Sequence, residues 1–194
     1  MYKANNRKSE YPIDPFFLNR WSPRAFSTEP IADETVLTIL ESAHWAPSCF
    51  NEQPCTFIIA NTAETRNVFY EFLVDSNRLW ADKAPVLIAI ISKKNFARNG
   101  KVNAWHSFDC GTAWGYLTME AYRQDLITHC MGGFKKDLAA KLLEIPEDYQ
   151  VEVIIALGKH ADLSVLPAEL QEQEVPSGRK ALQDVVFTGK WTAR

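Results

Sequence analysis

The segment that most constrains the fold is PVLIAIIS, residues 85 to 92, which is apolar up to its final serine. An unbroken apolar run of this length is typical of a central β-strand that is covered on both faces. It is also too short to cross a bilayer, which takes about 20 residues of helix. The rest of the chain therefore has to supply apolar layers on both sides of a sheet.

The segments around this run alternate between helical and strand periodicity. A helix is expected from Glu34, capped by Asp33 and stopped by Pro47. Further helices are expected at residues 63–80, 105–124 and 134–145, and further strands at residues 55–60, 126–131 and 150–158. This alternation predicts an α+β fold in which a mixed central β-sheet is flanked by helices.

The length of 194 residues fits a single domain spanning residues 1–194. From about residue 159 the chain becomes an irregular tail rich in Pro, Glu and Gln, with no strong element before residues 185–187. Long irregular segments of this kind usually wrap a neighbour or serve function.

Charge and composition exclude several classes of protein. The net charge of −3 gives no electrostatic basis for binding nucleic acid or an anionic membrane. The first fourteen residues lack the apolar core of a signal peptide, so we expect a soluble, cytoplasmic protein. The cysteines, Cys49, Cys55, Cys110 and Cys130, form no CxxC and no disulfide-like spacing, which favours free thiols.

Several common sites lack their sequence signals. There is no GxGxxG and no GxxxxGK[ST], so neither a Rossmann dinucleotide site nor a P-loop is indicated. The four histidines are scattered, which gives no support for a metal site. Cys49 next to the polar residues of its loop leaves a cysteine hydrolase as a weak alternative, because no particular histidine is placed beside it.

Three short stretches carry groups that suit a ligand. In NRWSPRAFS, Arg20, Ser22 and Arg24 alternate, so an extended segment points all three to one side, which suits a phosphate monoester. The alternative is that these side chains lie on an ordinary solvated surface.

In CMGGFKK, two glycines between a strand and a helix allow close approach of a ligand or simply make a tight turn. Gly111 and Gly115 share one helix face, which serves core packing or a subunit contact.

The third stretch is the loop APSCFNEQP, residues 46 to 54, which separates an expected helix from an expected strand. It holds two amide side chains, Asn51 and Gln53, between two prolines. The prolines restrict the backbone, so the amides are presented with little loss of entropy on binding.

Taken in this order, the motifs resemble those of the nitroreductase family of FMN-dependent oxidoreductases. RWSPRAF is similar to that family's Arg-x-Ser-x-Arg-x-Phe, and APSCFNEQP is similar to its Ala-Pro-Ser-x-x-Asn-x-Gln-Pro. MGGF, IP, IIALGK and a late GRKAL before Trp191 extend the resemblance over residues 12 to 191. The length resembles that of the compact members.

The resemblance implies an intertwined homodimer in which each FMN is shared by two chains. It implies that NADH or NADPH reduces the flavin, which then reduces an electron-poor acceptor such as a nitroaromatic or quinone in ping-pong order. The flavin carries the chemistry, so no catalytic side chain and no metal are expected. The alternatives are a flavoprotein of the same fold with another reaction, such as reductive dehalogenation or flavin breakdown, and a flavin-free cysteine hydrolase.

The resemblance also assigns the residues of the cofactor site. Arg20, Ser22 and Arg24 would take the phosphate and ribityl oxygens, and Asn51 would bond the polar edge of the ring. The full expected set is Arg20, Trp21, Ser22, Arg24, Pro47, Ser48, Phe50, Asn51, Gln53, Met131, Gly132, Gly133 and Arg179.

Three positions depart from the family pattern: Trp21 stands where many relatives carry Arg, Pro23 removes an N–H, and Cys55 replaces a common aromatic. Phe50, Phe96 and Trp105 are possible substrate-stacking residues, although core packing explains each of them equally well.

Overall fold

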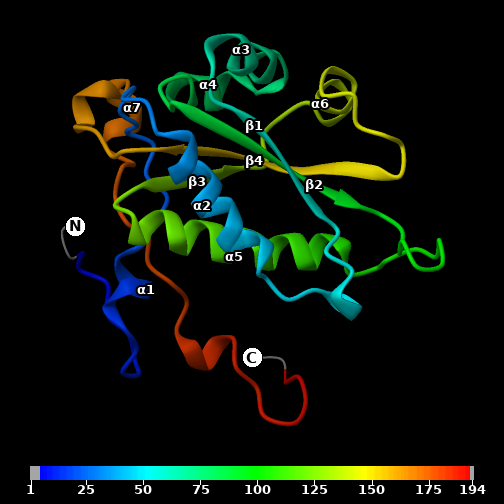
Figure 1. Ribbon diagram of the computed structural model, residues 1–194. Helices are drawn as coiled ribbons and strands as arrows, with labels where there is room; N and C mark the ends of the chain where they lie inside the picture. The colour runs from blue at the N-terminus through cyan, green and yellow to red at the C-terminus, as the bar shows by residue number, and fades with distance from the viewer. Residues whose placement is uncertain (1–4, 193–194) are drawn as a thin grey trace.

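The computed structural model describes residues 5–192, in which four strands form one sheet in the order β1-β2-β4-β3 (Figure 1). The strands are β1 Cys55–Ala60, β2 Val86–Lys93, β3 Ile127–Met131 and β4 Tyr149–Gly158. The α+β prediction is confirmed, but the expected mixed sheet is wrong, because every strand pair in the described part is antiparallel. A strand buried on both faces has the same apolar pattern whether its neighbours run parallel or antiparallel to it. The apolar run of β2 therefore did not reveal the direction of its neighbours.

Two helical layers cover the sheet. On one face lie α2 Asp33–His44 and α5 His106–Arg123; on the other lie α3 Ala63–Phe72, α4 Asp75–Ala81 and α6 Lys136–Leu142 (Figure 1). Side chains of β2 alternate between the layers: Leu87 joins the α3 core, and Ile88 joins the α2 and α5 core. The expected central strand, covered on both faces, is therefore present.

The predicted helix over residues 63–80 is two helices. The break falls at Leu73, which pairs with Phe134 in an isolated bridge, and at Val74, whose N–H donates to the carbonyl of Gly133. This tertiary pairing with the segment after β3 interrupts a sequence that is helical by local periodicity. Local periodicity carries no information about such a contact, so the break was not predicted.

Asp33 is the first residue of α2 rather than its cap, and its carboxylate accepts a hydrogen bond from the Asn61 side chain.

The short elements lie at the edges of this body: α1 Pro15–Asn19, η1 Cys49–Asn51, η2 Leu163–Val165, α7 Ala168–Gln171 and η3 Leu182–Asp184. The chain after β4 first returns along the N-terminal segment, where His160 pairs with Phe26. It then runs out beneath α5 as an extended tail (Figure 1). Residues 185–187 form no strand there, and Val185 and Val186 are exposed. No helix in residues 5–192 is long and apolar enough to span a bilayer.

Leu117 on α5 and Leu37 on α2 offer a matched test of this core. Leu117 is 0% exposed, whereas Leu37 is 59% exposed. Leu117→Ala should lower the free energy of unfolding by about 2–5 kcal/mol, because a buried cavity remains. Leu37→Ala should change it by less than about 0.5 kcal/mol. Urea denaturation of both variants checks this, and equal losses would contradict the two-layer core.

Candidate functional site

An arginine-rich cavity of about 270 Å³ lies between the N-terminal segment, β3 and the tail. We call it the arginine pocket; its lining is Arg7, Arg20, Trp21, Ser22, Arg24, His129, Gln173, Val175, Ser177 and Arg179. The alternating residues of RWSPRAF do point into one site, and Arg179 joins them from the tail. No acidic side chain is among the described residues that line it.

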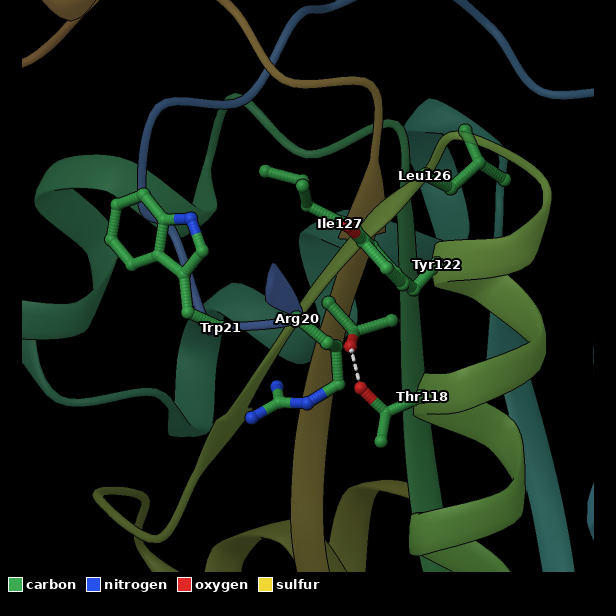
Figure 2. A pocket seen from close by; sticks show the side chains of 7 residues that line it. Arg20, Trp21, Thr118, Tyr122, Leu126 and Ile127 are labelled. Atoms are coloured by element: carbon green, nitrogen blue, oxygen red, sulfur yellow. Dashed lines mark hydrogen bonds between the residues drawn. The ribbon is translucent and has the colours of Figure 1, made fainter. Parts of the chain in front are cut away.

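Arg20 stands at the centre of this charge. Its pKa is lowered from the usual value by burial first, and then by repulsion from Arg7 and Arg179. Figure 2 shows Arg20 beside α5 and β3, which are joined there by a 2.6 Å hydrogen bond between the Thr118 and Thr128 hydroxyls. Like charges held together disfavour their own charged state, so an anion that entered would relieve the repulsion.

Arg7 was not expected from the sequence. Its Nε donates to the carbonyl of Ser177 at 2.8 Å, and its Nη1 donates to the carbonyls of Leu18 at 3.1 Å and Arg20 at 2.9 Å. It therefore joins the tail to the segment that carries Arg20. Because the acceptors are backbone carbonyls, no pattern of side chains in the sequence predicts this contact.

Glu174 is the second residue that sequence reasoning missed. Its side chain is 0% exposed, and its Oε1 accepts from the backbone N–H groups of Arg24 at 2.6 Å and Ala25 at 2.8 Å. Its Oε2 has no hydrogen-bond partner among the described residues and lies 4.0 Å from Arg24 Nη1. This carboxylate fixes the backbone from which Arg24 enters the pocket.

His129, on β3, fixes the same segment from the other side. Its Nδ1 donates to the carbonyl of Pro23 at 3.1 Å. Burial lowers the pKa of His129, and Arg24 lowers it further, so the ring is neutral near pH 7. Pro23 thus lacks a donor but still anchors the segment through its carbonyl.

The loop of residues 46–54 carries unusual backbone strain. Phe50, Asn51 and Gln53 have φ angles of 54°, 56° and 52° although none is glycine. Such conformations cost of order 1–3 kcal/mol each and cluster at functional sites. Asp109 of α5 accepts from the Cys49 N–H at 3.1 Å, and the Ser48 hydroxyl accepts from the Gln53 N–H at 2.9 Å. Pro47, Ser48 and Gln53 line a small cavity of about 30 Å³ behind the loop.

The two glycines after β3 differ in their surroundings. A Cβ on Gly133 would lie 2.8 Å from Asn77 Nδ2, and that amide donates to the Gly133 carbonyl at 3.0 Å. Gly133 is therefore needed where the chain packs closely against Asn77 of α4, and the tight turn that was the plain alternative stays a prediction. A Cβ on Gly132 would meet nothing within 4 Å, so its backbone is open to approach, whereas Met131 is buried.

Two groups of the expected residues, those of the arginine pocket and those of the loop, are not brought together within one chain. The loop is bonded to Asp109 near the start of α5, whereas Thr118 and Tyr122 near its end lie beside Arg20. At about 1.5 Å of rise per residue, these two places are about 14–20 Å apart along the helix. Figure 1 shows the loop, in cyan, at one end of α5 and the N-terminal segment, in blue, at the other.

The cysteines correct one expectation. Cys55, the first residue of β1, and Cys110, in the first turns of α5, form a disulfide with Cα atoms 5.5 Å apart. The sequence separation of 55 residues gave no hint of this contact, which depends on how α5 packs over the sheet. Cys49 and Cys130 are free, and burial raises the pKa of Cys130 to about 11. In the described part, no hydrogen bond joins the Cys49 thiol to a histidine, so nothing favours a cysteine hydrolase.

Glu174→Gln keeps an oxygen that can accept from the Arg24 and Ala25 N–H groups, whereas Glu174→Ala leaves both donors buried and unpaired. We expect Glu174→Ala to lower the free energy of unfolding by about 1–3 kcal/mol more than Glu174→Gln. Glu172→Ala, two residues away and exposed, is the control. Chemical denaturation measures all three variants. If the alanine and glutamine variants at residue 174 are equally stable, the carboxylate does not brace the pocket.

Comparison with known proteins places this geometry in a family. The family model described as the nitroreductase family matches residues 18–78 and 73–159. A crystal structure described as an oxidoreductase containing FMN is 45% identical, covers 100% of both chains and has a TM-score of 0.94. A nitroreductase from Exiguobacterium sibiricum, solved with FMN, shares the fold at a TM-score of 0.74 and 20% identity, over 95% of this chain and 100% of that one.

A curated relative adds an activity that belongs to that relative. The FMN reductase [NAD(P)H] of Bacillus subtilis is 27% identical over 173 residues, which cover 79% of this chain and 68% of the relative. The matched segments of the family model span most of the chain and contain both the arginine motif and the strained loop. The chain therefore belongs to the nitroreductase family.

Proposed function

We propose that the protein is an FMN-dependent oxidoreductase that uses NADH or NADPH to reduce electron-poor acceptors such as nitroaromatics or quinones. The arginine pocket is the observation that carries this proposal. It gathers four guanidinium groups without a lining acid. A terminal phosphate is the anion that such planar forks bind best.

The residues present fit FMN. Arg20, Ser22, Arg24 and Arg179 would hold the phosphate, while Arg7 keeps the tail in place. The Asn51 amide would bond the polar edge of the flavin ring, and the open backbone at Gly132 would allow the ring to lie close. Bound FMN would supply a two-electron carrier that accepts hydride from the reduced nicotinamide and gives it to the acceptor. The chain itself binds, orients and shields these partners.

The separation of the pocket and the loop supports a shared site in a homodimer. The outer face of α5 is open and apolar: Phe108 is 71% exposed, Tyr116 is 46% exposed, and a hollow of about 600 Å³ lies over this face and α1. A Cβ on Gly111 or Gly115 would meet nothing within 4 Å, which leaves room for a second helix.

In a two-fold dimer, the same face of both chains meets itself. If the two α5 helices run antiparallel across the axis, the loop end of one lies at the pocket end of the other. Each site would then take its arginines from one chain and its loop from the partner chain. The extended tail, with Val185 55% exposed and Trp191 79% exposed, would cover the partner and make the dimer intertwined. We place this dimer in the cytoplasm, where reduced nicotinamides are abundant.

Anaerobic titration tests the reaction. The FMN-loaded protein should lose its yellow absorbance when NADH or NADPH is added alone, because the donor needs no acceptor to reduce the flavin. Donor and acceptor would occupy one place in turn, so double-reciprocal plots at several acceptor concentrations should be parallel. Absence of bleaching, or intersecting lines, would sink the proposed mechanism. Cys49→Ser should keep the activity and serves as the control.

Complementation tests the shared site. Arg24→Ala should weaken FMN by roughly 10- to 150-fold, because a charge-assisted bond worth about 1.5–3 kcal/mol is lost. Asn51→Ala should weaken ring binding. In a heterodimer of one Arg24→Ala chain and one Asn51→Ala chain, a shared arrangement leaves one site intact and damages the other twice. Tight FMN binding at one site per heterodimer is expected.

Two results would contradict the arrangement. If both sites of the heterodimer bind FMN weakly, each site lies within one chain. Riboflavin, which lacks the phosphate, is the ligand control. Equal loss of riboflavin and FMN affinity in Arg24→Ala would show that the pocket does not hold the phosphate.

A further inference from the structure

The chain between β2 and α5 makes an ordered hairpin beside the strained loop. The Phe96 N–H donates to the Lys101 carbonyl at 2.8 Å, the Asn103 N–H donates to the Lys94 carbonyl at 2.8 Å, and Gly100 turns the chain at a φ of 69°. Glu52 of the loop accepts a hydrogen bond from the backbone N–H of Ala97. The hairpin and the loop are therefore connected to each other.

Arg98, at the tip of this hairpin, is stacked on aromatic rings. Its guanidinium carbon lies 4.0 Å from the centroid of the Phe50 ring and 5.1 Å from that of the Phe96 ring. The two rings meet edge to face at 6.1 Å, and Phe50 is 72% exposed. Stacking uses the face of the guanidinium and leaves its in-plane N–H donors free.

Several exposed cations of the chain are paired with carboxylates, whereas Arg98 is stacked on aromatic rings. Arg78 pairs with Asp82, Arg123 pairs with Glu120, and Lys159 pairs with Glu29. Within residues 5–192, no ion pair joins Arg98 to a carboxylate. The segment KKNFARNGK, residues 93 to 101, also contains no acidic residue. The hairpin thus holds at its tip an exposed guanidinium that takes part in no ion pair of the described residues.

The place matters because Phe50 precedes Asn51 in the strained loop. Consecutive Cα atoms are about 3.8 Å apart, so Arg98 lies close to the group proposed to read the flavin edge. An electron-poor planar ligand entering there would meet an aromatic shelf and a cation with open donors.

We propose that Arg98, supported by Phe50 and Phe96, is a subsite for an anionic group, phosphate or carboxylate, on the ligand that meets the flavin. This proposal rests on the proposed function and adds a substrate class to it. Two sources can carry that anion: the phosphates of the nicotinamide donor, or a carboxylate on the acceptor. Bidentate recognition by a planar fork suits both.

The test uses the FMN-loaded protein with Arg98→Ala and Arg98→Glu, and with Lys101→Ala as a control from the same hairpin. Calorimetry on the oxidised protein measures binding of NADP⁺ against nicotinamide riboside, and of 4-nitrobenzoate against nitrobenzene. We expect Arg98→Glu to weaken the anionic member of at least one pair by roughly tenfold or more. In Arg98→Ala, the member of each pair that lacks the anionic group, nicotinamide riboside or nitrobenzene, should bind as in the wild type, and so should FMN. The pair that responds identifies the source of the anion.

Equal losses in Arg98→Ala for the members with and without the anionic group, or no effect in either pair, would overturn the proposal. So would an equal loss in Lys101→Ala, because general surface charge would then be responsible. The proposed function fails separately, and this subsite with it, if the wild-type protein neither takes up FMN nor is bleached by a reduced nicotinamide. A protein that is bleached normally while Arg98 has no effect retains the function and loses only the subsite.

Discussion

Burial of β2 on both faces is the constraint on which the rest of the structure depends. Its alternating side chains require one helical layer on each side, and Ile88 and Ile90 are 0% exposed on the side that α5 covers. Helix α5 must therefore lie flat along the sheet. Because it runs for 18 residues, it also fixes how far apart its two ends hold the loop and the arginine pocket.

The arginine pocket is arranged before any ligand enters. Gathering four arginines costs electrostatic energy: the pKa of Arg20 is lowered by burial first, and then by repulsion from Arg7 and Arg179. The chain offsets part of this cost from behind the lining of the cavity, where a carboxylate oxygen of Glu174 lies 4.0 Å from Arg24 Nη1. Arg7 donates to backbone carbonyls, and the carboxylate of Glu174 lies behind the segment and holds its N–H groups. A site organised in this way loses little side-chain entropy when an anion binds.

The sequence predicted those features that depend on local periodicity or on an ordered set of motifs. The strand at β2 and the common side of Arg20, Ser22 and Arg24 follow from such patterns. The antiparallel direction of the sheet, the break at Leu73 and the pair of Cys55 with Cys110 depend on which segments meet in space. Tertiary contact of this kind has no local signal.

The residues that hold the pocket in place were also missed, because their contacts are tertiary. Arg7 donates to backbone carbonyls and Glu174 accepts from backbone N–H groups of residues that are far away in the chain, so no local spacing indicates either contact. Glu174 lies in the run QEQE, whose other acidic residue, Glu172, is exposed. Composition gives no reason to expect one of the two glutamates, rather than the other, to be buried. Only the buried position of Glu174 separates it from Glu172.

The proposed dimer accounts for the strained loop and the arginine pocket together. Three left-handed residues are costly in a connector, and one chain gives the loop no cofactor contact that would offset the cost. In the proposed dimer a symmetric partner would supply that contact, because an antiparallel pair of α5 helices exchanges the two ends. The open glycines and exposed aromatics of α5 are then the surface that permits the exchange. Burial of β2 holds α5 flat along the sheet, and the 18 residues of α5 separate the loop from the pocket, which is why the proposed FMN site draws on two copies of the chain.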